Sequence, residues 1–286
     1  MIAFVTYGDR PDLTEDDQLV VPLLAAHNIA VQAVVWNDPA VRWHEFDALV
    51  IRSTWDYHHQ SDQFAAWIER LRQIDVPLWN TADLLRWNMH KTYLRDLEAR
   101  GVPIVPTVWL DRGATADLAA ILAERGWNAA VIKPAVAASA YATWRTTRAS
   151  AAADQPKLND LLDHADVLAQ QFVSQIATGE WSLMFFGGSF SHAVLKRPAA
   201  GDFRVQAAFG GSSTPATPPA DLIRQAQQIV DQIDGPWLYV RVDGVAIDGT
   251  FVLMELELIE PFLFLGSDAD APQRFADAIS AVLTRR

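Results

Sequence analysis

The alternation of hydrophobic and polar residues predicts a mixed α/β chain. Over the first eighty residues, short β-rich runs lie at residues 2–6, 30–36 and 48–51, and helical patterns lie at residues 16–27 and 60–74. Strands that alternate with helices are typical of an open α/β sheet. We therefore predict an N-terminal α/β domain over residues 1–80.

The elements beyond residue 80 follow a different order. A helical pattern spans residues 81–100, candidate strands lie at residues 129–134, 141–148 and 167–173, a hairpin over residues 180–196 turns at Gly187–Gly188, and helices are predicted at residues 220–233 and 271–284. The length of 286 residues allows two or three subdomains, each with its own core.

Charged residues interrupt the apolar pattern of a second hairpin, over residues 238–261. Because side chains alternate along a strand, Arg241 and Asp243 share one face of its first strand, and Glu255 and Glu257 share one face of its second. Carboxylates in such strands are costly to bury unless positive charge meets them. Salt bridges would meet that need, and so would a divalent cation such as Mg²⁺.

The turn of this hairpin determines whether its carboxylates lie together. A tight two-residue turn would pair Asp243 with Met254 and place the carboxylates on opposite faces of the sheet. A three-residue loop or a β-bulge would instead pair Asp243 with Glu255 and Arg241 with Glu257. We predict the second register.

A candidate substrate site follows the strand at residues 48–51. Arg52, Ser53, Thr54 and Asp56 offer a cation, two hydroxyls and a carboxylate at the carboxyl end of that strand. Open α/β sheets place ligand groups at this position, so we predict substrate contacts there. The alternative, that this loop caps the following helix, stays open.

Composition excludes several classes of function. The net charge of −12 argues against non-specific nucleic-acid binding, which depends on excess Lys and Arg. The absence of cysteine excludes disulfides, thiolate nucleophiles and Cys-ligated zinc. We expect no membrane association, because no apolar run approaches the length of a span and the first residues lack the features of a signal peptide. A cytoplasmic location is the expectation.

Two further segments indicate phosphate chemistry. Lys133 ends an apolar strand, and the small-residue loop 135–140, which contains Ser139, follows it. Small residues let backbone N–H groups approach phosphate oxygens, and the lysine supplies a point charge. The long loop over residues 197–219 carries Phe203 and Arg204 among Gly, Pro, Ser and Ala, which favours a functional lid.

Taken in order, these features resemble the ATP-grasp superfamily, in which two α+β subdomains hold ATP between them. The resemblance covers residues 81–286, and residues 1–80 resemble the α/β domain that often precedes it. The order runs through a helix lysine, a strand lysine, a small-residue loop, a hinge strand, a Gly-Asp-Phe-Arg segment and paired carboxylates: Lys91, Lys133, residues 135–140, Gln170–Phe172, Gly201–Arg204, Asp243 and Glu255–Glu257.

The resemblance implies a fold and a set of site residues. The fold is the N-terminal open α/β domain followed by α+β subdomains over residues 81–166 and 167–286. It implies that ATP contacts Lys91, Lys133, Ser139, Gln170, Gln171, Val173 and Glu180. It further implies that Lys196, Arg204 and Arg241 face the transferred phosphate, and that Asp243, Glu255 and Glu257 hold Mg²⁺ or Mn²⁺.

Two residue patterns depart from the superfamily. Glu257 stands where an Asn is usual, and the phosphate loop has alanines where relatives have glycines, so its conformation must be one that Ala can adopt. The Gly201–Arg204 loop is similar to that of the ribosomal-protein glutamate ligase and glutathione synthetase branch. The runs Arg52–Tyr57 and Met254–Pro261 look like the group that contains D-cycloserine synthetase.

The resemblance also implies a reaction. We expect an ATP- and Mg²⁺-dependent carboxylate–amine or cyclising ligase that acts on a small amino-acid-like substrate through an acyl phosphate, and a homodimer. A phosphotransferase with the same ATP site, and a nucleotide-binding module without turnover, remain as alternatives.

Overall fold

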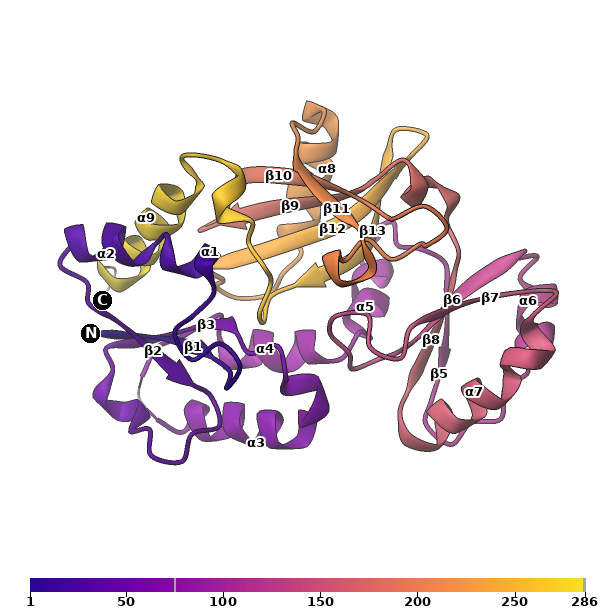
Figure 1. The fold of residues 1–286 in the computed structure, drawn as a ribbon, viewed down its shortest axis with the longest axis horizontal. Helices are drawn as coiled ribbons and strands as arrows, with labels where there is room; N and C mark the ends of the chain where they lie inside the picture. Colours follow the sequence, from indigo (N-terminus) through magenta and orange to yellow (C-terminus); the bar gives the residue numbers. More distant parts are fainter. Residues whose placement is uncertain (75, 285–286) are drawn as a thin grey trace.

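The computed structural model describes residues 1–74 and 76–284, and Figure 1 shows its three sheets and the helices around them. The first sheet is parallel, with strand order β2-β1-β3-β4. Its strands are β1 (Ile2–Thr6), β2 (Val31–Val35), β3 (Ala48–Ser53) and β4 (Leu78–Trp79). This arrangement confirms the predicted open α/β sheet near the N-terminus.

Helices beside the parallel sheet complete its core. The helix α3 (Ser61–Arg72) buries Phe64 and Trp67 against the sheet, where they meet Trp36. The helix predicted over residues 16–27 is two short helices, α1 (Glu15–Gln18) and α2 (Val21–Ala26). The second begins at Val21–Pro22, where the fixed φ of proline favours a first helical turn.

The prediction of one helix over residues 81–100 is wrong. The chain forms α4 (Ala82–Met89) and α5 (Tyr93–Ala99), and His90 between them is extended, with φ −110° and ψ 123°. Contacts from other parts of the chain hold the break. The backbone N–H of Lys91 donates to the carbonyl of Ala135 at 2.8 Å, and the His90 ring meets Asp166 at 3.0 Å. These long-range partners outweigh local helix propensity.

The second sheet is antiparallel, with order β5-β8-β6-β7. It consists of β5 (Thr107–Leu110), β6 (Ala129–Pro134), β7 (Trp144–Thr147) and β8 (Val167–Gln171), and its core includes α6 (Leu118–Glu124) and α7 (Ala151–His164). We call it the central sheet. It contains β8, which the predicted boundary after residue 166 had assigned to the C-terminal subdomain.

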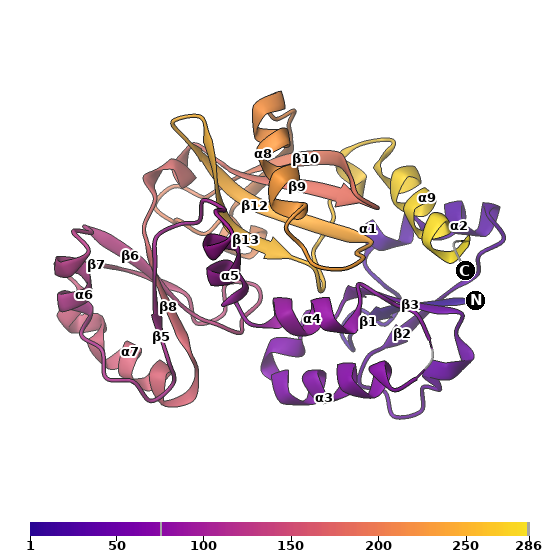
Figure 2. The same ribbon diagram turned by 180° about the vertical axis from the view of Figure 1, so that it is seen from behind.

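The third sheet, which we call the C-terminal sheet, is antiparallel with order β11-β10-β9-β12-β13. Its strands are β9 (Glu180–Phe186), β10 (Ser189–Arg197), β11 (Ser212–Pro215), β12 (Tyr239–Ile247) and β13 (Thr250–Glu257). Leucines of α5 and apolar residues of α8 (Ala220–Val230) form one core with it, and Figure 2 shows these helices beside β12 and β13. The predicted hairpin at Gly187–Gly188 is confirmed.

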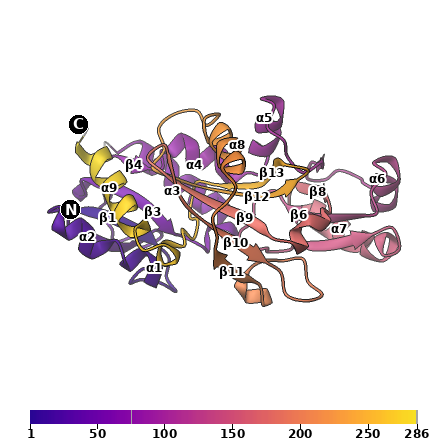
Figure 3. The same ribbon diagram turned by 90° about the horizontal axis from the view of Figure 1, so that it is seen from above.

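The N-terminal and C-terminal parts of the chain share a core. The helix α9 (Ala271–Thr284) packs beside α2, and its Phe275 lies in one apolar cluster with Phe4 and Tyr239. Figure 3 shows α9 and α2 at the same end of the molecule, opposite α6 and α7. The parallel sheet and the C-terminal sheet are therefore joined by buried apolar contact.

The β12–β13 hairpin has the predicted register beyond its turn, because Asp243 pairs with Glu255 and Arg241 with Glu257. The turn itself is the tight kind, since Ile247 pairs directly with Thr250. A bulge between Asp243 and Gly244 shifts the register between these two regions. Of the two predicted solutions, the chain uses the bulge, and it places the charged residues on one face of the sheet.

Candidate active site

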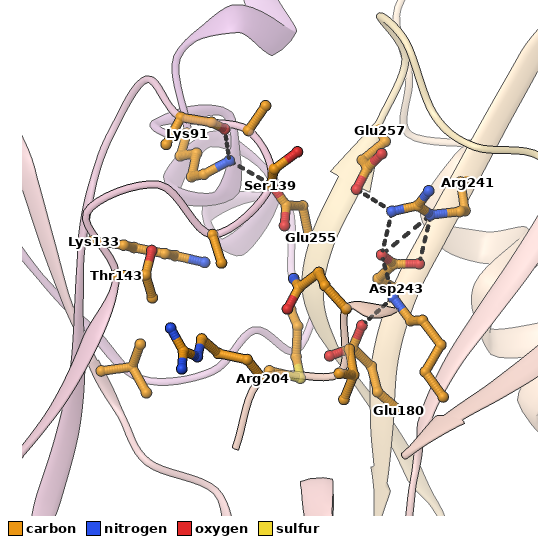
Figure 4. A pocket seen from close by; sticks show the side chains of 18 of the residues that line it. Lys91, Lys133, Ser139, Thr143, Glu180, Arg204, Arg241, Asp243, Glu255 and Glu257 are labelled. Carbon is orange, nitrogen blue, oxygen red and sulfur yellow. Dashed lines mark hydrogen bonds and ion pairs between the residues drawn. The ribbon is translucent and has the colours of Figure 1, made fainter. Parts of the chain in front are cut away.

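A cavity of about 560 Å³ lies between the central sheet and the C-terminal sheet. Figure 4 shows the side chains that face one another across it. Every residue that the superfamily resemblance placed at the nucleotide, the transferred phosphate or the metal lines this cavity: Lys91, Lys133, Ser139, Gln170, Gln171, Val173, Glu180, Lys196, Arg204, Arg241, Asp243, Glu255 and Glu257. They come from both subdomains, although up to 166 residues separate them in sequence.

On the C-terminal sheet, ion pairs surround the buried carboxylate of Asp243. Lys196 Nζ and Arg241 Nη2 each lie 3.0 Å from Asp243 Oδ2, and the hydroxyl of Ser182 donates to Oδ1. Arg241 also pairs with Glu257, as Figure 4 shows. Burial alone would raise the pKa of Asp243, but Arg241 and Lys196 outweigh it and hold that pKa well below its usual range. Asp243 is therefore ionised and fully occupied by protein partners.

Glu257 carries negative charge that its neighbours compensate only in part. Burial, together with the charges of Asp243 and Glu255, raises its pKa to about 7 although Arg241 opposes the rise. Glu255 forms an ion pair with Lys91, whose Nζ also donates to the carbonyl of Ala137 at 3.2 Å. The negative charge on this wall of the cavity is therefore only partly neutralised, and an additional cation would be stabilised there.

The carboxylates of Glu255 and Glu257 offer the oxygen ligands that Mg²⁺ prefers, and they lie two residues apart on one strand face. Among residues 1–74 and 76–284, no three carboxylate or imidazole groups are arranged to hold a metal ion. The ion pairs to Lys91 and Arg241 occupy these oxygens instead. The donor chemistry and the excess negative charge fit a divalent cation that displaces those pairs.

The opposite wall presents a cation with no counter-ion. Lys133, at the end of β6, is half-buried, and no hydrogen bond or ion pair to its ammonium group is found among the described residues. Burial lowers its pKa to about 8. Figure 4 shows its side chain extending into the cavity from the central sheet. A half-buried ammonium group of this kind suits an anionic ligand such as a phosphate.

The loop after Lys133 adopts a conformation that glycine normally takes. Ser139, Ala140 and Ala142 have positive φ values of 52°, 57° and 47°. The left-handed conformation costs an L-residue about 1–2 kcal/mol. The alanines are therefore held in a strained backbone at the cavity, and such strain concentrates at functional sites.

The strand β8 and the segment after it form the end of the cavity expected to hold adenine. Gln170, Gln171 and Val173 line it together with Phe172, and the amide of Gln170 donates to Thr107 at 3.1 Å. Glu180, expected at the ribose, pairs with Lys196 at 2.5 Å. Burial raises the pKa of Glu180, and Lys196 opposes this rise.

The segment 197–215 lies against the cavity. Phe203 and Arg204 line it, and β11 within the segment pairs with β10. The guanidinium of Arg204 pairs with Asp202 at 2.8 Å and stacks 3.6 Å from the centre of the Phe209 ring. Arg204 therefore has only local partners, and a phosphate that bound nearby could replace them.

The residues predicted to contact substrate lie outside the lining of the cavity. Arg52 is fully buried and pairs with Asp17 at 2.8 Å, while the Ser53 hydroxyl lies 2.9 Å from that of Thr6. Thr54 is buried, and Asp56 accepts a hydrogen bond from Trp36 at 2.8 Å. The side chains between and after them, Trp55 and Tyr57, line the cavity instead.

The site residues predicted from the sequence do not include several aromatic and acidic residues that line the cavity. Trp55, Tyr57, Glu260 and Phe262 all line it. Trp55 and Tyr57 were visible in the run that carried the substrate prediction. Glu260 lies three residues beyond Glu257 and directly before a proline, where a strand cannot continue, and that position was the available signal.

Comparison with known proteins gives a consistent result. Residues 2–80 match the family model described as "D-cycloserine synthetase DcsG, N-terminal domain". The cycloserine biosynthesis protein DcsG of Streptomyces lavendulae is 32% identical over 302 aligned residues, which cover 98% of each chain. This chain belongs to the DcsG family of ATP-grasp ligases.

Solved structures agree with this assignment. The crystal structure of D-cycloserine synthetase DcsG has a TM-score of 0.88 at 28% identity and covers 99% of each chain. D-alanine–D-alanine ligase from Bacillus anthracis, complexed with ATP, has a TM-score of 0.70 at 15% identity and covers 99% of this chain and 97% of its own, which shows the common fold.

Family membership decides between the open alternatives. The protein is an ATP-dependent ligase that forms C–N bonds, not a phosphotransferase or a nucleotide-binding module without turnover. The ATP-grasp fold predicted from the sequence is confirmed. No helix within the described residues is long and apolar enough to span a membrane.

Proposed function

We propose that the enzyme uses ATP and Mg²⁺ to join the carboxylate of a small amino-acid-like molecule to an amine. We further propose that both groups lie on one molecule, so that the product is a ring, as the name D-cycloserine synthetase states for its relative. The observation that carries the proposal is the cavity itself. Its Lys133 faces a wall of carboxylates and cations. The same cavity is lined by Trp55 and Phe262, and apolar lining with a few polar groups is typical of small-molecule sites.

The residues on the central sheet would bind the nucleotide. Lys133 and the strained loop after it would meet the phosphates, and Gln170 to Val173 would meet the adenine. Lys91 would reach the phosphates once its ion pair with Glu255 opens. Each cation would reduce the repulsion between ATP and a substrate carboxylate, which are both anions.

The residues on the C-terminal sheet would stabilise the charge that develops during phosphoryl transfer. Glu255 and Glu257 would hold Mg²⁺, which neutralises phosphate charge when it is bound. Asp243, the third metal ligand predicted from the sequence, is not included because Lys196 and Arg241 already pair with it. Asp243 would hold Lys196 and Arg241 in place, because both already pair with it at 3.0 Å. Lys196 and Arg241 would then face the transferred phosphate with fixed orientation.

The reaction needs no nucleophilic side chain. A carboxylate oxygen attacks the γ-phosphorus, ADP leaves with the bonding electron pair, and an acyl phosphate forms. The amine then attacks the acyl carbon, phosphate leaves with its electron pair, and the nitrogen loses a proton to give the amide. Arg204 and Phe203 would exclude water from the acyl phosphate, which water would otherwise hydrolyse.

The test follows from the chemistry of D-cycloserine. Opening its ring amide by hydrolysis gives β-aminooxy-D-alanine, which carries a carboxylate and a nucleophilic aminooxy group on one molecule. We expect this compound to stimulate ADP and phosphate release with Mg²⁺ and ATP, and to yield D-cycloserine detectable by mass spectrometry. Stimulated ADP release without a ring product would assign the enzyme to intermolecular ligation. No stimulation would reject this substrate.

A further inference from the structure

The segment that follows β13 is held in an unusual way. Each backbone carbonyl from Leu258 to Leu263 accepts a hydrogen bond from a side chain elsewhere in the chain. The donors, in order, are Asn80 at 2.7 Å, Tyr239 at 2.8 Å, Trp55 at 2.9 Å, Arg52 at 3.2 Å, Arg241 at 3.0 Å and His192 at 2.9 Å. The six backbone carbonyls of this segment are thereby satisfied, although it lies outside regular secondary structure.

This network indicates a role for the buried residues at the carboxyl end of β3 and just after it. Arg52 holds the carbonyl of Pro261, and Trp55 holds that of Glu260. The buried pair of Arg52 with Asp17 fixes the guanidinium group in turn. The run therefore acts on the cavity through the Glu260 segment, and not by direct contact of Arg52 with a ligand.

The charged side chain that this segment presents to the cavity is that of Glu260. Its carboxylate has no hydrogen bond or ion pair with any described residue, in contrast to Glu180, Asp243, Glu255 and Glu257, which all have one. Burial raises the pKa of Glu260 to about 8, and the charge of Glu257 adds to that rise. Because a buried charge without a partner is costly, the unliganded carboxyl group is largely neutral at pH 7, and a ligand cation would stabilise its ionised form.

The surroundings of Glu260 also suit a cation. Trp55, Tyr57 and Phe262 also line the cavity. The Trp55 indole donates to the backbone carbonyl of Glu260, and its ring lies 6.3 Å from that of Phe262. Aromatic faces attract ammonium groups, and the attraction strengthens where water is excluded. The nearest lysine on this wall, Lys91, is already paired with Glu255.

We infer that the carboxylate of Glu260 binds the α-ammonium group of the substrate, an inference that rests on the proposed function. The aminooxy nitrogen of the proposed substrate is weakly basic and stays neutral, so it is free to attack the acyl carbon. The α-amine is protonated and supplies the cation that Glu260 lacks. Glu260 thus selects amino acids over simple carboxylic acids and orients the reacting carboxylate.

The experiment compares two ligands that differ only in this amine. Binding of β-aminooxy-D-alanine and of 3-aminooxypropanoate is measured by calorimetry in the presence of Mg²⁺ and a non-hydrolysable ATP analogue, for the wild type and for Glu260→Gln. We expect the wild type to bind the amino acid about tenfold tighter or more, and Glu260→Gln to bind the two ligands equally. Glu124→Gln, on an exposed helix position, is the matched control and should keep the wild-type preference.

The outcomes separate this inference from the proposed function. If the wild type binds both ligands equally or neither, or if folded Glu260→Gln retains the preference, the ammonium assignment is overturned. If the preference depends on Glu260 but no ring product forms, the assignment stands and the proposed cyclisation fails. Thermal unfolding shows whether Glu260→Gln is folded, and the wild-type comparison decides the matter if it is not.

Discussion

The two walls of the cavity, which we propose bind anions, differ in how their charged side chains are paired. On the central sheet, Lys133 has no ion pair with any described residue, and the loop after it has a strained backbone. On the C-terminal side, the cations that line the cavity are already paired with carboxylates. Lys196 pairs with Glu180 and Asp243, Arg241 pairs with Asp243 and Glu257, and Lys91, which lies between α4 and α5, pairs with Glu255. The wall formed by the central sheet could therefore bind a phosphate directly. On the C-terminal wall, the existing ion pairs would have to open first.

The difference lies in the number of charges that each wall buries. Burial penalises the charged form of Lys133, but a pKa of about 8 leaves most of its ammonium groups charged at pH 7, so this cation can stay unpaired and still attract an anion. A dense group of charges cannot stay unpaired, because each would lose its hydration. Under the proposed function, the internal ion pairs of the C-terminal sheet would keep these groups oriented until Mg²⁺ and substrate replace their partners.

The largest expected effect concerns the C-terminal wall, where ion pairs would have to open. Glu255→Gln removes a proposed Mg²⁺ ligand and the anionic partner of Lys91, so we expect turnover to fall by about 10³-fold or more while the protein stays folded. Steady-state ADP release and a thermal melt measure the two effects. Glu124→Gln is the control, and activity within about tenfold of the wild type would reject the role of Glu255.

A smaller loss is expected at Arg204, which leaves its local partners only in the reacting state. Arg204→Ala should lower kcat by roughly 100-fold and change the Kd for ATP by less than about threefold, because its phosphate contact forms mainly during phosphoryl transfer. The exposed Arg224→Ala serves as control. Equal losses in kcat and ATP affinity would show that Arg204 binds the ground state instead.

The nucleotide wall should respond in binding and not only in turnover. Lys133→Met removes a charge-assisted contact to phosphate, and we expect ATP to bind about 10- to 100-fold more weakly, as measured by calorimetry. Lys157→Met, an exposed lysine on α7, should leave affinity unchanged. An unaltered Kd in Lys133→Met would mean that the unpaired lysine is not a phosphate ligand.

The smallest expected effect is a pH dependence of ATP affinity. The lowered pKa of Lys133, about 8, means that the free enzyme loses this charge as the pH rises through 8, whereas bound phosphate favours the charged form. Affinity should therefore be highest below pH 8 and fall by up to about tenfold per pH unit above it. Lys133→Arg keeps its charge and should show a flatter profile. Parallel profiles for the two proteins would assign the titration to another group.

Much of this molecule followed from local sequence. Short strands alternating with helical patterns determined the N-terminal sheet, and the tight turn at Gly187–Gly188 determined the β9–β10 hairpin. The even register of Asp243 with Glu255 followed from the cost of burying carboxylates on the wrong face. The resemblance of the order of lysines, small residues and carboxylates to the ATP-grasp superfamily identified many of the residues that line the cavity.

Other features depended on contacts that no local pattern encodes. Local propensity favours one helix through His90, yet a hydrogen bond from Lys91 to Ala135 and the contact of His90 with Asp166 break it. The polar residues at 52–56 suggested ligand contact, but partners from distant segments, Asp17, Thr6 and Trp36, bury or occupy Arg52, Ser53 and Asp56. The position of Glu260, held through the carbonyls around it, likewise depends on side chains up to 209 residues away. Periodicity reports which face a residue occupies, whereas the partner it meets is decided only when the sheets pack together.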